Sequence, residues 1–161
     1  MRKVFYLFIL FLFSNTLSAQ PAVPKDTVLG ISIKQVSTPY GFAIQSLSPS
    51  ALEVRKQILK GNKTLYRLGT NGKSAPPEKA QFWSAEDPRI DSADYARKYG
   101  IPLENVIHAD YLVEAVLNDT TDFITREAPP APGQTTSAGG IEVVVPPGSL
   151  RVVNTIVYKK Q

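Results

Sequence analysis

Ile141-Glu-Val-Val-Val145 is the stretch of sequence that decides the fold class of this chain. In an extended strand its side chains alternate, so Glu142 and Val144 lie on one face and the three other side chains lie on the opposite face. Pro146-Pro-Gly148 then turns the chain, and a second β-rich run extends from Leu150 to Tyr158. The C-terminal part of the chain is therefore predicted to form β-strands.

Further strands and two short helices are predicted outward from this stretch. The strands are expected at Val28–Val36, Tyr40–Leu47, Lys63–Leu68 and Val106–Leu117, the last with a bend or bulge, and at Asp122–Arg126, which is expected to pair with Val106–Leu117. One helix is expected to begin at Ser50 and end before Gly61, and the other is expected at Ser92–Tyr99. The expected fold class is α+β with a mostly antiparallel sheet.

Residues that favour helix ends mark both helices. Ser50 and Glu53 have the spacing of a capping box, in which each side chain binds the other residue's backbone N–H. Gly61 stands where a left-handed residue ends a helix, and Gly100 has the same place after the helix that Ser92 is expected to cap.

The first nineteen residues are predicted to be a secretory signal peptide, because basic residues precede an apolar run and a short polar exit. The apolar run, Val4–Phe13, has ten residues, and a helix needs about 20 to cross a bilayer. We therefore expect cleavage near Ala19, a secreted or periplasmic protein, and no permanent membrane anchor. The expected organisation is a signal peptide at 1–19, a lead-in segment at 20–47 and one domain at 48–161.

Composition excludes several classes of function. There is no cysteine, which excludes disulfides and thiolate nucleophiles and favours a bacterial source for an exported chain. His108 is the single histidine, which makes a zinc site improbable, and it lies far from Ser84 in sequence with no evident triad, which makes a serine hydrolase unlikely. It is predicted to lie in an apolar strand. Basic residues occur in scattered pairs without interleaved aromatics, so there is no nucleic-acid-binding signature.

Three polar residues are candidates for chemistry. Glu142 is a carboxylate on a strand that directly follows the glycine- and proline-rich segment 128–140, which is predicted to be a mobile loop or a hinge. The alternative is an exposed acid on the wet face of the sheet. Arg67 precedes the loop that begins at Gly69, and a guanidinium beside exposed backbone donors suits a diphosphate; the alternative is again simple exposure. Ser84 follows Phe82-Trp83, of which one ring is expected in the core and the other in a pocket wall.

An ordered set of short motifs carries a resemblance to a known family. They are Leu65-Tyr66-Arg67-Leu68-Gly69, Gln81-Phe82-Trp83-Ser84, Tyr95-Ala-Arg-Lys-Tyr-Gly-Ile-Pro102, Phe123-Ile-Thr-Arg-Glu-Ala-Pro129 and Gly139-Gly-Ile-Glu-Val-Val144. In this order they resemble the ADP-ribosyltransferase fold of the arginine-serine-glutamate type, as found in the C-terminal toxin modules of bacterial polymorphic toxins. The resemblance covers Thr64–Val145.

The resemblance implies a split β-sandwich that binds nicotinamide adenine dinucleotide (NAD) as a substrate, with no metal. Arg67 would hold the phosphates or ribose, Ser84 would orient the catalytic carboxylate, and Glu142 would stabilise the cationic transition state. Tyr66 or Trp83 would stack on the nicotinamide, and Gly69 would belong to the cofactor-binding loop. The implied partners are a macromolecular acceptor of ADP-ribose and an immunity protein, neither of which the sequence identifies.

Two other functions stay open. Many arginine-modifying members of the family have Glu or Gln two positions before the catalytic glutamate, where this chain has Gly140, and segment 128–140 carries no aromatic or charged residue for target recognition. Water as the acceptor would make the protein an NAD glycohydrolase. The remaining alternative is a secreted β-rich binding or envelope protein without activity.

Overall fold

The structure is a computed structural model that describes residues 27–28, 31–32, 34–61, 63–118, 122–130, 133, 135 and 138–158. The predicted signal peptide lies outside the described residues. Part of segment 128–140 also lies outside the described residues, so the mobility of this segment stays a prediction. No helix of the described ranges is both long and apolar enough to cross a bilayer.

The fold is α+β, as predicted, and every paired strand is antiparallel. A six-stranded sheet has the order β10-β7-β5-β6-β9-β8. Its strands are β5 (Leu65–Gly69), β6 (Phe82–Ser84), β7 (Tyr111–Leu117), β8 (Ile124–Glu127), β9 (Ile141–Val144) and β10 (Leu150–Val157). Two hairpins precede it, β1 (Thr27–Val28) with β2 (Ile31–Ser32), and β3 (Gln35–Thr38) with β4 (Gly41–Ile44). The helices are α1 (Pro49–Leu59), α2 (Ser92–Lys98), α3 (Leu103–Ile107) and the 3-10 turn η1 (Pro77–Lys79).

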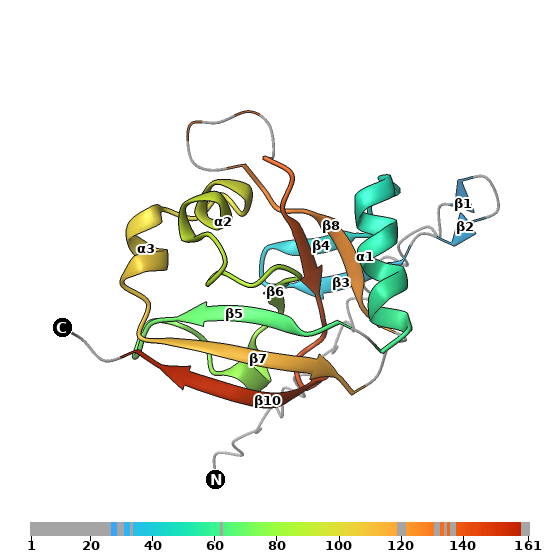
Figure 1. The fold of residues 1–161 in the computed structure, drawn as a ribbon. Coiled ribbons are helices and arrows are strands. Elements are labelled where there is room, and N and C mark those ends of the chain that lie inside the picture. The colour runs from blue at the N-terminus through green and yellow to red at the C-terminus, as the bar shows by residue number, and fades with distance from the viewer. Residues whose placement is uncertain are drawn as a thin grey trace, which may run out of the picture.

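The six-stranded sheet divides in its middle. β5 pairs with β7 over five residue pairs, but it meets β6 at one bridge, Tyr66 opposite Ser84. Figure 1 shows the consequence, because β5, β7 and β10 run across the lower part of the molecule while β9 and β8 cross them at a steep angle. The opening between the two halves lies beside that single bridge.

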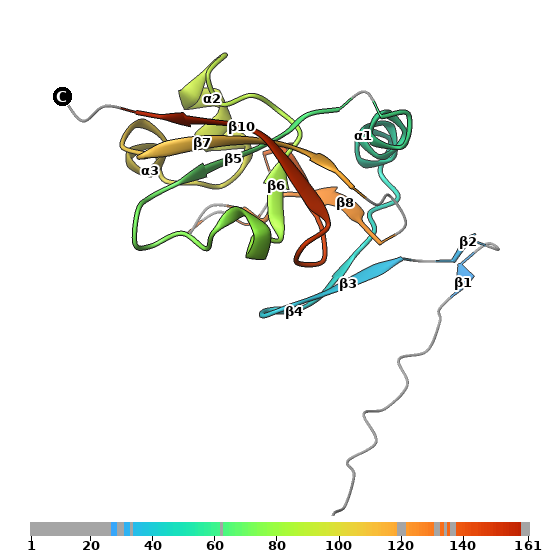
Figure 2. The same ribbon diagram turned by 90° about the horizontal axis from the view of Figure 1, so that it is seen from below.

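Among the described residues, three apolar clusters hold these layers together. The largest joins α1 to both halves of the sheet through Ile58, Leu65, Trp83, Phe123 and Val143. A second cluster packs the β3–β4 hairpin, through Val36 and Ala43, on Ile124 and Val144 of β8 and β9, and Figure 2 shows this hairpin as a layer below those strands. The hairpin belongs to the predicted lead-in segment.

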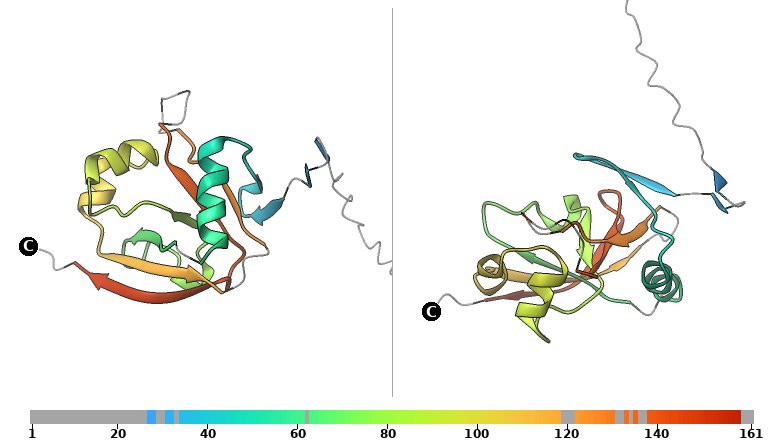
Figure 3. Two further views of the ribbon diagram at one scale, coloured as in Figure 1. Left: turned by 45° about the vertical axis from the view of Figure 1, so that its right-hand side comes forward. Right: turned by 90° about the horizontal axis from the view of Figure 1, so that it is seen from above.

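The third cluster joins α2 and α3 through Tyr95, Tyr99 and Val106. Figure 3 shows this helix pair on the side of the molecule opposite to α1, with β6 and β9 between them. The pair therefore lies at the end of the opening in the sheet.

The helix ends are only partly as predicted. Gly61 and Gly100 adopt positive φ angles of 74° and 62°, which confirms both as left-handed residues after a helix. The predicted N-caps are wrong. Ser48 caps α1 by accepting the Ala51 N–H at 3.3 Å, because Pro49 is already in the first turn, and Asp91 caps α2.

The predicted strand Val106–Leu117 is wrong in its first part. Residues up to Ile107 form helix α3, and β7 begins at Tyr111. His108 therefore caps a helix end and is exposed beside Glu104, outside any strand. The short helix buries Val106 against α2, a tertiary contact that overrides the β-branched residues' local preference.

Two strand predictions are also wrong. β8 pairs with β9 and makes no ladder with β7. The predicted strand Val28–Val36 is divided among β1, β2 and the start of β3. The turn after Val145 is confirmed by the positive φ of Gly148, but β9 and β10 lie in opposite halves of the sheet.

Candidate active site

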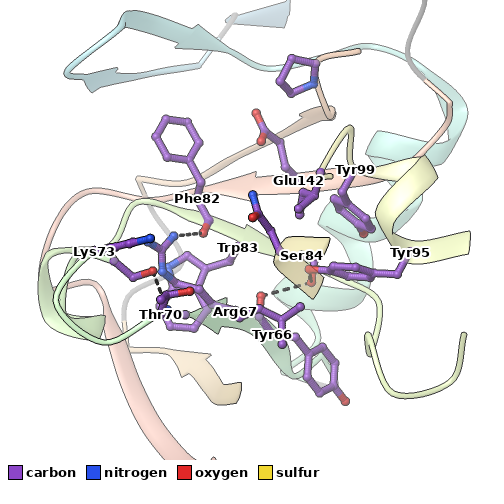
Figure 4. Close-up of a pocket in the computed structure, with 16 residues that line it drawn as sticks. Tyr66, Arg67, Thr70, Lys73, Phe82, Trp83, Ser84, Tyr95, Tyr99 and Glu142 are labelled. Atoms are coloured by element: carbon purple, nitrogen blue, oxygen red, sulfur yellow. Dashed lines mark hydrogen bonds between the residues drawn. The ribbon is translucent and has the colours of Figure 1, made fainter. Parts of the chain in front are cut away.

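A pocket of about 450 Å³ lies at the opening between the two halves of the sheet. Its wall is built by β5 and the following loop, β6, α2, the α2–α3 connection, α3 and β9, together with Pro129 after β8. All six candidate residues line it, namely Tyr66, Arg67, Gly69, Trp83, Ser84 and Glu142. Figure 4 shows the side chains that surround this space.

The strand register explains why residues far apart in sequence meet here. Ser84 lies opposite Tyr66 on one side and opposite Glu142 on the other, and Glu142 lies opposite Arg126. Residues directly opposite in an antiparallel ladder put their side chains on the same face. One row across four strands therefore carries tyrosine, serine, glutamate and arginine.

Glu142 is buried, with 8% of its surface exposed. The alternative prediction of a solvent-exposed acid is therefore wrong. Arg126 Nε donates to Glu142 Oε1 at 2.6 Å. Burial raises the pKa of the Glu142 carboxyl above its ordinary value, and the Arg126 guanidinium opposes that rise. The carboxylate is thus held by a charged partner at the edge of the pocket.

The Ser84 hydroxyl is committed to neighbours other than Glu142. Its single proton is within hydrogen-bond distance of two carbonyl oxygens, those of Tyr66 at 3.1 Å and Glu86 at 2.9 Å, and its oxygen accepts the Tyr95 hydroxyl at 2.9 Å. The family resemblance implied that Ser84 orients the carboxylate. In this structure the hydroxyl instead ties β6 to β5 and α2, and the direct contact with the carboxylate comes from Arg126.

Arg67 bridges the opening in the sheet. Its guanidinium is partly buried and donates from Nη1 to the Phe82 carbonyl oxygen at 3.0 Å, where the β5–β6 ladder has already ended. Its Nε is buried and has no hydrogen-bond partner. Burial lowers the pKa of this guanidinium. The prediction of a merely exposed arginine is therefore wrong.

The loop after β5 makes the second end of the pocket polar and cationic. Ser74 Oγ accepts the Thr70 N–H at 2.9 Å, and Asp110 Oδ2 accepts the Asn71 N–H at 2.8 Å. Lys73 lines the pocket from this loop. A Cβ at Gly69 would lie 2.2 Å from the Tyr111 ring, so a larger residue there needs that ring to move.

Trp83 contributes its side chain to the core. Its ring is 2% exposed and its Nε1 donates to the Ala80 carbonyl oxygen at 3.1 Å. Phe82, in contrast, is partly buried at the pocket wall, which confirms one ring in the core and one at the pocket. Stacking of nicotinamide on Trp83 does not fit this placement, and the Tyr66 ring points away from Glu142 in Figure 4.

Two tyrosines were missed as pocket residues. Tyr95 of α2 and Tyr99, the residue directly after α2, stack with ring centroids 4.6 Å apart, and Tyr99 donates to the Ile141 carbonyl oxygen at 3.2 Å. Burial raises the pKa of Tyr95 to about 12 and also raises that of Tyr99. Their spacing of four residues on a predicted helix was a signal that both rings share one face.

The described residues contain no group of three or more His, Cys, Asp or Glu side chains suited to a metal ion. The pocket offers instead a buried carboxylate beside aromatic rings at one end and the two cations Arg67 and Lys73 at the other. Comparisons of the chain with models of protein families, with curated proteins and with solved structures find no match.

Proposed function

We propose that this protein is an exported, toxin-like enzyme that cleaves the nicotinamide–ribose bond of NAD and transfers ADP-ribose to a macromolecule. The observation that carries the proposal is that Arg67, Ser84 and Glu142, from three neighbouring strands, line one pocket. The single bridge between β5 and β6 also supports a split β-sandwich of the ADP-ribosyltransferase type as the finer description of the fold.

The two ends of the pocket match the two charges of this substrate. NAD has a positively charged nicotinamide ring and a negatively charged diphosphate. Glu142 with the Tyr99 ring would accept the nicotinamide riboside, since a carboxylate and an aromatic face both attract a cation. Arg67 and Lys73 would hold the diphosphate, because a guanidinium matches phosphate oxygens and the buried Arg67 Nε still lacks an acceptor.

The reaction needs electrostatic stabilisation more than a nucleophile from the protein. As the bond between ribose C1′ and the nicotinamide nitrogen breaks, both electrons leave with nicotinamide and the ribose becomes cationic. An ionised Glu142, which is itself only 8% exposed, would stabilise that charge. The acceptor's nucleophilic atom then bonds to C1′ and loses its proton.

Water as the acceptor is the second candidate, and the packing at Gly140 favours it. A Cβ at this position would lie 2.7 Å from the Lys98 carbonyl oxygen, so the backbone before Glu142 has no room for a side chain. The place from which an acceptor-binding side chain would flank Glu142 is therefore closed by α2. In that case the products would be nicotinamide and free ADP-ribose.

The test is to incubate the purified protein with NAD carrying a label in its adenosine part and to measure nicotinamide release. Glu142→Gln is expected to lower release at least about 100-fold, since it removes the charge that stabilises the transition state. Glu104→Gln, the same change at an exposed carboxylate, is the matched control. For Arg67→Gln, which should raise KM for NAD, the control is the exposed Arg151→Gln.

A target-cell lysate distinguishes the two acceptors. Label that becomes attached to macromolecules supports transfer, whereas free labelled ADP-ribose supports hydrolysis. If NAD is not consumed with or without lysate, the proposed function is wrong, and the non-enzymatic binding protein remains.

A further inference from the structure

Arg126 makes the most direct contact with the Glu142 carboxylate, although neither the motifs nor the resemblance assigned it a role. It lies on β8 directly opposite Glu142 on β9, and its Nε reaches Oε1 at 2.6 Å. Its side chain is 32% exposed and that of Glu142 is 11% exposed. The ion pair is therefore shielded from water mainly on the Glu142 side.

The geometry leaves half of the carboxylate available. Arg126 is the only described residue that hydrogen-bonds the Glu142 side chain, and it does so at Oε1. Oε2 is thus left for a ligand. A carboxylate held at one oxygen has a defined orientation at the other, because rotation of the carboxyl group would break a short, charge-assisted hydrogen bond.

The strand that carries Arg126 is itself fixed. The neighbouring Thr125 is fully buried, and Gln45 bonds its backbone N–H, its backbone carbonyl and its hydroxyl at 3.1, 2.9 and 2.9 Å. Ser46 N–H donates to the same carbonyl at 3.0 Å, and Arg55 supports Gln45 at 3.0 Å. The segment from β4 to α1 therefore sets the position of β8 next to the pocket.

We propose that Arg126 is a positioning residue for the reaction: it holds Glu142 through Oε1 and keeps the buried carboxylate ionised, so that Oε2 is presented to the substrate. This inference rests on the proposed function, because the purpose of the ion pair depends on Glu142 being catalytic. It adds a residue that neither the motifs nor the resemblance assigned.

Other charged or titratable groups around the site do not replace Arg126. Arg67 of β5 and Lys73 of the following loop line the same pocket, as do Tyr95 of α2 and Tyr99 directly after it. The Arg67 guanidinium donates to the Phe82 carbonyl oxygen, the Tyr95 hydroxyl donates to Ser84 Oγ, and the Tyr99 hydroxyl donates to the Ile141 carbonyl oxygen. Removal of Arg126 therefore leaves the raised pKa of Glu142 without its main opposing influence.

The experiment compares native protein with Arg126→Gln and Arg126→Lys, and with Arg151→Gln as the control for loss of an exposed arginine. Carboxyl ¹³C NMR follows the titration of Glu142, with Glu142→Gln to identify its signal. In Arg126→Gln the midpoint should rise by about 1 to 3 pH units, as expected when a contacting opposite charge is lost. Arg126→Lys should restore part of that difference, and Arg151→Gln should change nothing.

The pH dependence of nicotinamide release supplies the second measurement. Its acidic limb should move upward with the Glu142 midpoint in Arg126→Gln, and kcat should fall more than KM rises. A Glu142 titration that is the same in native protein and Arg126→Gln overturns the inference while leaving the proposed function intact. Absence of turnover in the native protein overturns the proposed function, and with it the catalytic purpose of Arg126, even if the titration shifts.

Discussion

Thr125→Val is the substitution whose effect follows most directly from the structure. Thr125 is fully buried on β8. Its Oγ1 donates to the Ala51 carbonyl oxygen at 2.8 Å and accepts Gln45 Nε2 at 2.9 Å, which ties α1 and the segment after β4 to the strand that carries Arg126. Valine has nearly the same shape but no hydroxyl, so the change removes both hydrogen bonds without creating a cavity.

The expected loss is about 2 kcal/mol in the free energy of unfolding, since each buried hydrogen bond contributes about 1 kcal/mol. The loss stays near that value because Gln45 Nε2 keeps the carbonyl oxygens of Ser46 and Thr125 as acceptors, at 2.7 and 2.9 Å. For a domain of this size it corresponds to a fall in Tm of about 5 to 10 °C.

Urea denaturation and thermal melting, both followed by circular dichroism, measure this loss. Thr155→Val on the exposed face of β10 is the matched control, and it should change stability by less than about 0.5 kcal/mol. If Thr125→Val is as stable as the native protein, or if both substitutions cost the same, the reasoning from the buried hydrogen bonds is refuted.

Three further predictions concern the pocket. Gly140→Ala should lower the free energy of unfolding by about 1 to 3 kcal/mol in urea denaturation. The reason is that the new Cβ must move about 0.7 Å away from the Lys98 carbonyl oxygen to reach ordinary contact at 3.4 Å. An unchanged urea midpoint would contradict the close packing. Trp83→Phe should lower the free energy of unfolding by about 1 to 3 kcal/mol in the same assay without changing KM for NAD, because the ring lies in the core. A raised KM with unchanged stability would instead support the predicted stacking of Trp83 on nicotinamide. The raised pKa of Glu142 means that the folded state binds its proton more tightly than the unfolded state. The contribution of Glu142 to stability is therefore full below the ordinary pKa of 4.5 and is lost as the pH rises through the folded-state value. The Tm of Glu142→Gln should accordingly increase relative to the Tm of the native protein as the pH rises. The opposite trend would refute the raised pKa of Glu142.

The predictable parts of the fold are those that depend on neighbouring residues. Gly61 and Gly100 could be placed at helix ends because a left-handed conformation strongly favours glycine. The N-caps were displaced by one or two residues, since Ser48, Ser50, Asp91 and Ser92 all accept backbone N–H groups well and local sequence does not choose among them. Helix α3 was missed because its five residues form a helix through packing against α2.

The candidate site likewise contains residues that local sequence could identify and one that it could not. Glu142, Arg67 and Ser84 could be selected because each is a polar group in or beside an apolar strand, yet the sequence left simple exposure as an equal or better explanation for Glu142 and Arg67. Arg126 could not be selected, because Asp122–Arg126 was expected to pair with Val106–Leu117. Only the pairing of β8 with β9 puts its guanidinium opposite the carboxylate.

The sequence by itself determined the α+β class, the turns and helix ends that glycine and proline dictate, and the three residues that are candidates for chemistry. These follow from local backbone preferences and from the alternation of side chains along a strand. The tertiary structure decided which strands are neighbours, where the sheet opens, and that Glu142 is buried against Arg126. Strand order and register depend on contacts between segments far apart in the sequence, such as Gln45 with Thr125, which are 80 residues apart, and no local pattern encodes those contacts.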